Sequence, residues 1–147
     1  MPFNDRAEDP YSTQEKEIPE ESMINIIETK AAPDPIGPYS QAVRIDGLVF
    51  VSGQIPVEPT TGRVVEGGIA AQTHQVMKNL HAVLAAAGSG LDKIVKTTVF
   101  LASLDDFPVF NQVYKEYLGN SRPARATVQA ARLPLEVLLE IEAVAVA

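Results

Sequence analysis

The segment 122–146 contains the side chains with the clearest capacity for chemistry. Its first half alternates like a β-strand and carries Arg125 on one face. After a turn signal at Pro134, a second alternating run places Glu140 and Glu142 on one face. The two runs predict a terminal hairpin that brings an arginine close to carboxylates. Because the planar guanidinium binds a carboxylate in a bidentate way, the pattern indicates a site for a small organic acid.

The same residues could instead form a structural ion pair inside a sheet. If Arg125 pairs directly with Glu140, the guanidinium lowers the pKa of that carboxyl, which makes Glu140 a poorer base and a better orienting group. If Glu140 lies beside the reacting centre, it can accept a proton from an attacking water or relay one. The sequence leaves both roles open.

Three further residues are candidates for ligand binding. Tyr39 follows Gly37-Pro38, a stiff turn that fixes the direction of its ring. Ser52 and Gly53 end a predicted buried strand, where a glycine allows close approach of a ligand and a hydroxyl can donate or accept. The Gly-x-Ser-x-Gly pattern of a nucleophile elbow is missing around Ser52. A tyrosine packed at a subunit contact is the alternative for Tyr39.

The elements that position these residues follow from the hydrophobic pattern. Strands are expected over 23–27, 41–45, 48–52, 94–102 and the two terminal runs, and helices over 69–87 and from Asp105 or Asp106 to Leu118. The order βββαβαββ describes an α+β domain of two layers, with a mixed β-sheet and two helices on one face. The other face then needs a partner if its Val and Ala residues are to be buried.

Composition narrows the class of protein. A chain of 147 residues favours one domain, and it contains no Cys, which excludes disulfides and thiolate metal sites. Residues 1–22 hold seven acidic and two basic residues, so they carry most of the net charge of −7. We expect an acidic, disordered extension over 1–22 ahead of a domain at 23–147. His74 and His81 are expected to be solvated. The chain shows neither a membrane-spanning run nor a secretory pattern, and a cytoplasmic location is expected.

Several blocks of this sequence resemble the reactive intermediate deaminases of the RidA/YjgF type, also known as L-PSP endoribonucleases or translation inhibitors. The resemblance runs from about residue 23 to residue 147 and keeps the order and spacing of the blocks. The blocks are Ile-Gly-Pro-Tyr-Ser-Gln-Ala at 36–42, Val-Ser-Gly-Gln-Ile-Pro at 51–56, Ile-Val-Lys-Thr-Thr-Val-Phe-Leu at 94–101, Pro-Ala-Arg-Ala-Thr-Val at 123–128, Ala-Arg-Leu-Pro at 131–134 and Glu-Ile-Glu-Ala at 140–143.

This resemblance implies a chorismate-mutase-like fold, assembled as a homotrimer with clefts between neighbouring subunits. It also implies a 2-iminobutanoate/2-iminopropanoate deaminase. Such an enzyme hydrolyses 2-aminoacrylate, 2-aminocrotonate and their 2-imino acid tautomers to 2-keto acids and ammonia. A small 2-imino or 2-keto acid is then the expected ligand, with no cofactor and no metal.

The resemblance also assigns roles to individual residues. Arg125 matches the arginine that holds the substrate carboxylate, and Glu140 matches the glutamate that lies with a water beside the reacting centre. Tyr39 and Asn111 match residues of the cleft, although Asn111 could equally be an ordinary amide on a helix surface. Thr127 departs from the family, since many members carry a cysteine there. A threonine excludes any mechanism that needs sulfur and leaves the backbone at this position available to a ligand.

Two other functions compete with imine hydrolysis. A single-strand ribonuclease or translation inhibitor would bind RNA, but binding to phosphates depends on clustered Lys and Arg. The acidic chain has no basic run, so no nucleic-acid partner is expected. The third candidate is a trimer that binds a small ligand without turning it over.

Overall fold

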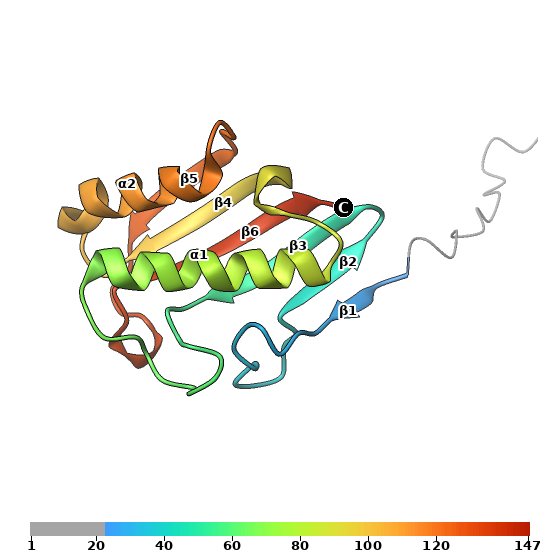
Figure 1. The fold of residues 1–147 in the computed structure, drawn as a ribbon, viewed down its shortest axis with the longest axis horizontal. Helices are drawn as coiled ribbons and strands as arrows, with labels where there is room; N and C mark the ends of the chain where they lie inside the picture. Colours follow the sequence, from blue (N-terminus) through green and yellow to red (C-terminus); the bar gives the residue numbers. More distant parts are fainter. Residues whose placement is uncertain (1–22) are drawn as a thin grey trace, which may run out of the picture.

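One mixed β-sheet carries both helices on a single face (Figure 1). The computed structural model describes residues 23–147, so the extension predicted over 1–22 lies outside the described residues. The predicted α+β class and the order βββαβαββ are confirmed. The elements are β1 Asn25–Ile27, β2 Ala42–Ile45, β3 Leu48–Gln54, α1 Ile69–Ala86, β4 Ile94–Leu101, α2 Phe107–Leu118, β5 Ala124–Gln129 and β6 Leu139–Val146.

Strand order in the sheet is β1-β2-β3-β6-β4-β5, which makes the predicted terminal hairpin wrong. β6 pairs antiparallel with both β3 and β4, whereas β5 runs parallel to β4 at the edge of the sheet. Alternate residues of β6 are buried beneath the helices, and this apolar row is best covered at the centre of the sheet. β5 buries none of its residues fully, which fits an edge position.

Local signals fixed the turns and helix ends well. Asp46 and Gly47 both have positive φ, as the tight turn between β2 and β3 requires. α1 ends at a cap on Ala87, and Gly88 follows with φ of 76°. Asp106 occupies the N-cap position of α2, where the sequence predicts the helix to start, but its side chain makes no capping hydrogen bond. A short 3₁₀ turn, Leu104–Asp106, precedes α2, and its own cap is Ser103.

The core lies between the helices and the sheet. α1 contributes a row of fully buried residues, and α2 contributes Phe110. His74 of α1 was expected to be solvated, but it is half-buried and its Nδ1 lies 2.9 Å from the Tyr117 hydroxyl of α2. The fully buried apolar residues of α1 are Val76, Met77, Leu80, Val83 and Leu84.

Two buried amides of α1 hold the loops at one end of the sheet. The Asn79 side chain donates to the carbonyls of Ile55 and Val57, at 3.1 and 3.0 Å. Gln72 accepts a hydrogen bond of 2.8 Å from the backbone N–H of Leu138, directly before β6. A buried amide that satisfies loop backbone groups in this way restricts where those loops can lie.

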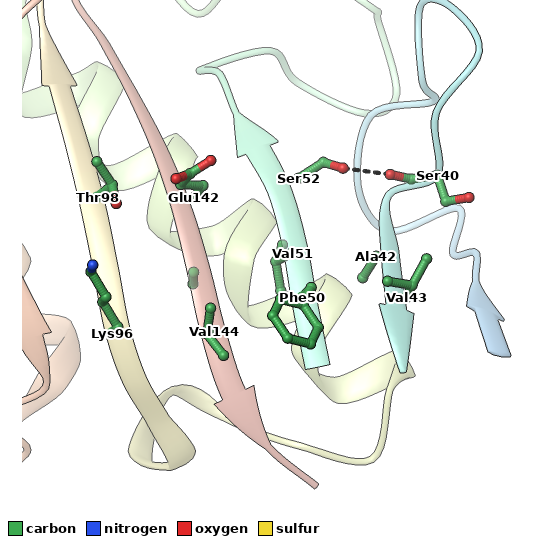
Figure 2. Close-up of a pocket in the computed structure, with 11 residues that line it drawn as sticks. Ser40, Ala42, Val43, Phe50, Val51, Ser52, Lys96, Thr98, Glu142 and Val144 are labelled. Atoms are coloured by element: carbon green, nitrogen blue, oxygen red, sulfur yellow. Dashed lines mark hydrogen bonds between the residues drawn. The ribbon is translucent and has the colours of Figure 1, made fainter. Parts of the chain in front are cut away.

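The face of the sheet opposite the helices exposes apolar side chains. Phe50 and Val128 are each more than two-fifths exposed, and Val43 and Val144 are half-buried beside Phe50. Figure 2 shows part of this face, where Phe50 lies between Val144 and Val43. Within residues 23–147, no helix is both long and apolar enough to cross a lipid bilayer.

Candidate active site

The predicted site residues fall on two faces of the sheet and form two separate groups. Glu140 alternates with the buried residues of β6, so its side chain points to the face without helices. Arg125 points the other way, because its guanidinium packs against α2. Within one chain, the proximity of Arg125 to Glu140 that the predicted hairpin implied is therefore wrong.

The first group, here called the acid half-site, lines a cavity of about 500 Å³. Four predicted residues, Tyr39, Ser52, Gly53 and Glu140, meet there. Residues that complete the lining are Ile36, Ile55, Pro134 and Glu142.

A β-bulge builds the acid half-site. Val51 pairs with Ala143 and Gln54 pairs with Ile141, so two residues of β3, Ser52 and Gly53, lie opposite Glu142 alone. A Cβ atom at position 53 would overlap a carboxylate oxygen of Glu140. The glycine at this position therefore creates the space that the Glu140 carboxyl occupies.

Burial raises the pKa of Glu140 above its ordinary value, and the nearby Glu142 carboxylate raises it further. Among residues 23–147 the ion pairs are Lys30–Asp34 and Arg132–Glu136, and neither involves Glu140. The ion pair that would have lowered the basicity of Glu140 is thus not formed within the chain. A raised pKa makes the ionised carboxylate a stronger base than an exposed glutamate, which favours a role in proton transfer.

Each of two hydroxyls in the acid half-site forms one hydrogen bond within the protein and can form another with a ligand. The Ser52 hydroxyl donates to the Ser40 carbonyl at 2.6 Å, so it can still accept (Figure 2). The Tyr39 hydroxyl accepts from the Ile36 backbone N–H at 3.1 Å, so it can still donate. Gly37 has a φ of 142°, and a Cβ atom at this position would lie 3.6 Å from the Tyr39 ring.

The second group, here called the basic half-site, lines a cavity of about 370 Å³ beside α2 and includes Asn111 and Arg125. Arg125 donates to the Asn111 side-chain oxygen at 2.8 Å. Since a guanidinium has five N–H donors, this bond holds the group in place and leaves donors for a ligand. Lys115 and Arg122 also line the cavity, and Arg122 donates to the carbonyls of Gly119 and Ser121.

Three aromatic rings of α2 support the Arg125 guanidinium. Its central carbon lies 5.0 Å from the Tyr114 ring centre, with Phe107 at 5.4 Å and Phe110 at 5.8 Å. The Tyr114 hydroxyl in turn forms a buried hydrogen bond of 2.8 Å with Thr97 of β4. Sequence reasoning missed this cradle, although the helical spacing of the three aromatic residues around Asn111 is a signal that could have found it.

Thr127 lies on the same strand as Arg125 but lines none of the cavities described. Its hydroxyl is buried and is the one buried side-chain polar atom within residues 23–147 that has no hydrogen-bond partner. Substrate binding at Thr127, through its backbone groups, stays a prediction.

Comparison with known proteins assigns this chain to a family. The family model described as "Endoribonuclease L-PSP" matches residues 29–147. The chain belongs to the RidA/YjgF/L-PSP family. A RutC family protein of Pyrococcus horikoshii is 50% identical over 123 residues, which cover 84% of this chain and 98% of the relative. The human 2-iminobutanoate/2-iminopropanoate deaminase is 47% identical over 121 residues, or 82% of this chain and 88% of the relative.

Solved structures agree with the RidA/YjgF/L-PSP assignment. The crystal structure of Escherichia coli TdcF with bound serine superposes with a TM-score of 0.80 at 45% identity. The match covers 84% of this chain and 98% of TdcF. Within residues 23–147 of this family member, no group of three or more His, Cys, Asp or Glu side chains could hold a metal ion.

The cradle of Arg125 yields a first prediction. Tyr114→Phe leaves the buried Thr97 hydroxyl without its hydrogen-bond partner, so we expect the free energy of unfolding to fall by about 1–3 kcal/mol. The double variant Tyr114→Phe/Thr97→Val removes both polar groups and should regain most of that loss. Urea unfolding of the two variants and the parent measures this, and a double variant no more stable than Tyr114→Phe would contradict it.

Glu140 yields a second prediction, on pH. Glu140 has a higher pKa in the folded state than in the unfolded state, so the folded state binds its proton more tightly. The free energy of unfolding therefore falls as the pH rises from the ordinary pKa of a glutamate through the raised pKa. Glu140→Gln should therefore melt at a higher temperature than the parent at neutral pH, and the two should converge in acid below the ordinary pKa. Glu136→Gln, on an exposed residue of the Arg132 ion pair, is the matched control and should not melt higher. Equal melting of Glu140→Gln and the parent at neutral pH would contradict the raised pKa.

Proposed function

We propose that this protein hydrolyses 2-imino acids to 2-keto acids and ammonia, as a homotrimer whose sites form between subunits. The observation that carries the proposal is the division of the site: a carboxyl suited to proton transfer lies on one face of the sheet, and an immobilised arginine lies on the other. The human relative named as a deaminase for 2-iminobutanoate and 2-iminopropanoate supports the reaction class.

Association of copies is supported by the two half-sites. Each half-site is open and incomplete in one chain, and their charges are complementary. The acid half-site carries Glu140 and Glu142, while the basic half-site carries Lys115, Arg122 and Arg125. Contact between the acid half-site of one copy and the basic half-site of the next would place both kinds of group around one ligand.

The apolar face of the sheet also supports association. Monomeric proteins rarely expose large contiguous apolar patches, and burial in an assembly removes that cost. Adjacent positions of this face, which begins beside the acid half-site, are occupied by apolar side chains. These are Val43, Leu48, Phe50, Val144 and Val146.

The proposed reaction needs modest assistance, since an imine carbon is already electrophilic. Arg125 of one copy holds the substrate carboxylate through its free donors. Glu140 of the neighbouring copy takes a proton from water as the water oxygen bonds to the imine carbon, and it passes this proton to the imine nitrogen, which gives a carbinolamine. Glu140 then takes the proton of the carbinolamine hydroxyl and delivers it to the amino nitrogen as the C–N bond breaks, so that ammonia leaves and the keto group forms. No cofactor is part of this scheme.

Tyr39 and Ser52 supply complementary contacts in this scheme. The free hydrogen of the Tyr39 hydroxyl can donate to a substrate oxygen, and the Ser52 oxygen can accept from a substrate N–H. The serine bound to TdcF is a small amino acid with a carboxylate and a nitrogen on the adjacent carbon, and a 2-imino acid shares that arrangement. Asn111 acts in our proposal as a positioning residue that holds Arg125.

An RNA-directed function is less well supported by the site. One of the three cations in the basic half-site, Arg122, already donates to two backbone carbonyls. Two carboxylates line the acid half-site and repel phosphates. Binding without turnover, the third candidate, is separated by the assay below.

A third prediction tests the reaction. The imine is generated in situ by an amino-acid oxidase, and release of keto acid is followed with and without the protein. We expect acceleration by the parent protein and a loss of about 10- to 100-fold in Arg125→Lys, because lysine keeps the charge but not the bidentate fork. Lys78→Arg, an exposed change on α1, is the control and should keep full activity. No acceleration by the parent would refute the proposed reaction, and a fully active Arg125→Lys would refute the role of Arg125.

A fourth prediction tests whether the site spans two chains. Light scattering should give the mass of a trimer, and a monomer at micromolar concentration would refute the assembly. Arg125→Lys and Glu140→Gln should each be nearly inactive alone. Coexpressed as mixed trimers, they should recover about a quarter of the parent activity, since some interfaces then pair an intact Arg125 with an intact Glu140. No recovery would mean that the two residues act within one chain.

A further inference from the structure

A second cavity adjoins the acid half-site and has a different chemical character. It has a volume of about 200 Å³ and shares four lining residues with the first cavity. The shared residues are Ile36, Tyr39, Gly53 and Ile55. Because the Glu140 carboxyl occupies the space beside Gly53, the shared wall of the two cavities lies next to the proposed reacting centre.

The walls of this second cavity are mostly apolar. Leu135 closes one side of it, and Asp34 is the one charged residue among those that line it. A water in the liquid occupies about 30 Å³, so the cavity has room for several heavy atoms. The apolar lining residues are Pro33, Pro35, Ile36, Ile55, Val57, Pro59 and Leu135.

Leu135 is held in an unusual conformation that presents it to this cavity. Its φ is 54° and that of Glu136 is 55°, in the left-handed region that non-glycine residues rarely adopt. Its side chain is 59% exposed, so burial in its own chain does not explain a leucine here. An exposed Arg132–Glu136 ion pair of 2.7 Å spans the turn, and the Val137 N–H donates to the Pro134 carbonyl across it. Backbone strain that surrounding contacts maintain is typical of functional sites.

We infer that this cavity is a subsite for the substrate side chain, with Leu135 as a specificity-determining residue. The inference rests on the proposed imine hydrolysis. A substrate carbon beside Glu140 would direct its side chain past Gly53 and into the apolar cavity. The preferred substrates are then 2-imino acids with unbranched or branched apolar side chains of three or more carbons.

Charge excludes another class of substrate from this subsite. A side-chain carboxylate would approach Asp34 and the two glutamates of the acid half-site, with no cation among the residues that line either cavity. Dicarboxylic imino acids should therefore be the poorest substrates.

The experiment compares imines that differ only in the side chain. Oxidase-generated 2-iminopropanoate, 2-iminobutanoate, 2-iminopentanoate and 2-iminobutanedioate are assayed by keto-acid release, each corrected for its uncatalysed rate. We expect kcat/KM for the five-carbon imine to exceed that for the three-carbon imine by about tenfold or more, with the dicarboxylic imine lowest. A kcat/KM that is flat or falls with chain length would overturn the inference and leave the proposed reaction intact.

Variants of Leu135 identify the residue responsible. Leu135→Asn tolerates the left-handed conformation but removes the apolar wall, so the five- to three-carbon ratio of kcat/KM should fall towards one. Leu135→Met keeps an apolar side chain and should keep the ratio. Leu104→Asn, a matched change at an exposed leucine outside both cavities, should also keep it. A ratio that survives in Leu135→Asn would overturn the role of Leu135.

A binding measurement separates the subsite from the reaction. If no imine is turned over, the proposed function fails, and calorimetry with 2-oxopentanoate and 2-oxopropanoate decides the subsite by itself. Tighter binding of the five-carbon acid, lost in Leu135→Asn, would support the apolar subsite. Equal binding of the two acids would overturn it.

Discussion

The position of β6 between β3 and β4 is the constraint on which the rest of the structure depends. One row of its side chains, Leu139, Ile141, Ala143 and Ala145, is buried beneath the helices. The strict alternation of a strand then fixes Glu140 and Glu142 on the other face, so the core and the acid half-site are set by the same strand. The bulge in β3 and its second residue, Gly53, leave space for the Glu140 carboxyl on this face.

The same alternation keeps Arg125 away from Glu140 in one chain. α2 forms the crossover connection between β4 and β5, so β5 pairs parallel with β4 at the edge of the sheet. In this position Arg125 faces α2. The aromatic rings and Asn111 hold the guanidinium while donors remain for a ligand. A site made of these two groups is best explained by contact between copies, and the exposed apolar face supplies a physical reason for copies to associate.

Two residues beside the proposed reacting centre carry a cost in stability. Glu140 is half-buried beside a second carboxylate, and Leu135 adopts a backbone conformation that leucine disfavours. Neither residue belongs to the buried core. Local costs of this kind are maintained where a binding or catalytic role offsets them, and the two residues line two cavities that share four lining residues.

The sequence by itself determined the features that depend on neighbouring residues. The Asp46-Gly47 turn, the end of α1 at Gly88 and the alternation around Glu140 are set by interactions within a few positions, so they could be predicted. Motifs spread along the chain also indicated the family, and with it the residues that form the two half-sites. The aromatic support of Arg125 was not predicted, because it depends on how α2 packs on β5.

Only the tertiary structure decided which strands are neighbours and which groups meet. Adjacent alternating runs predict a hairpin, but β6 pairs with β3 and β4 instead, because pairing along both edges buries its apolar row at the centre of the sheet. That choice removed the expected contact of Arg125 with Glu140, whose pKa burial raises, and the packing of α1 on α2 brought His74 within hydrogen-bond distance of Tyr117. These outcomes depend on contacts between residues far apart in the chain, and a local pattern contains no information on which distant partner gains most from burial.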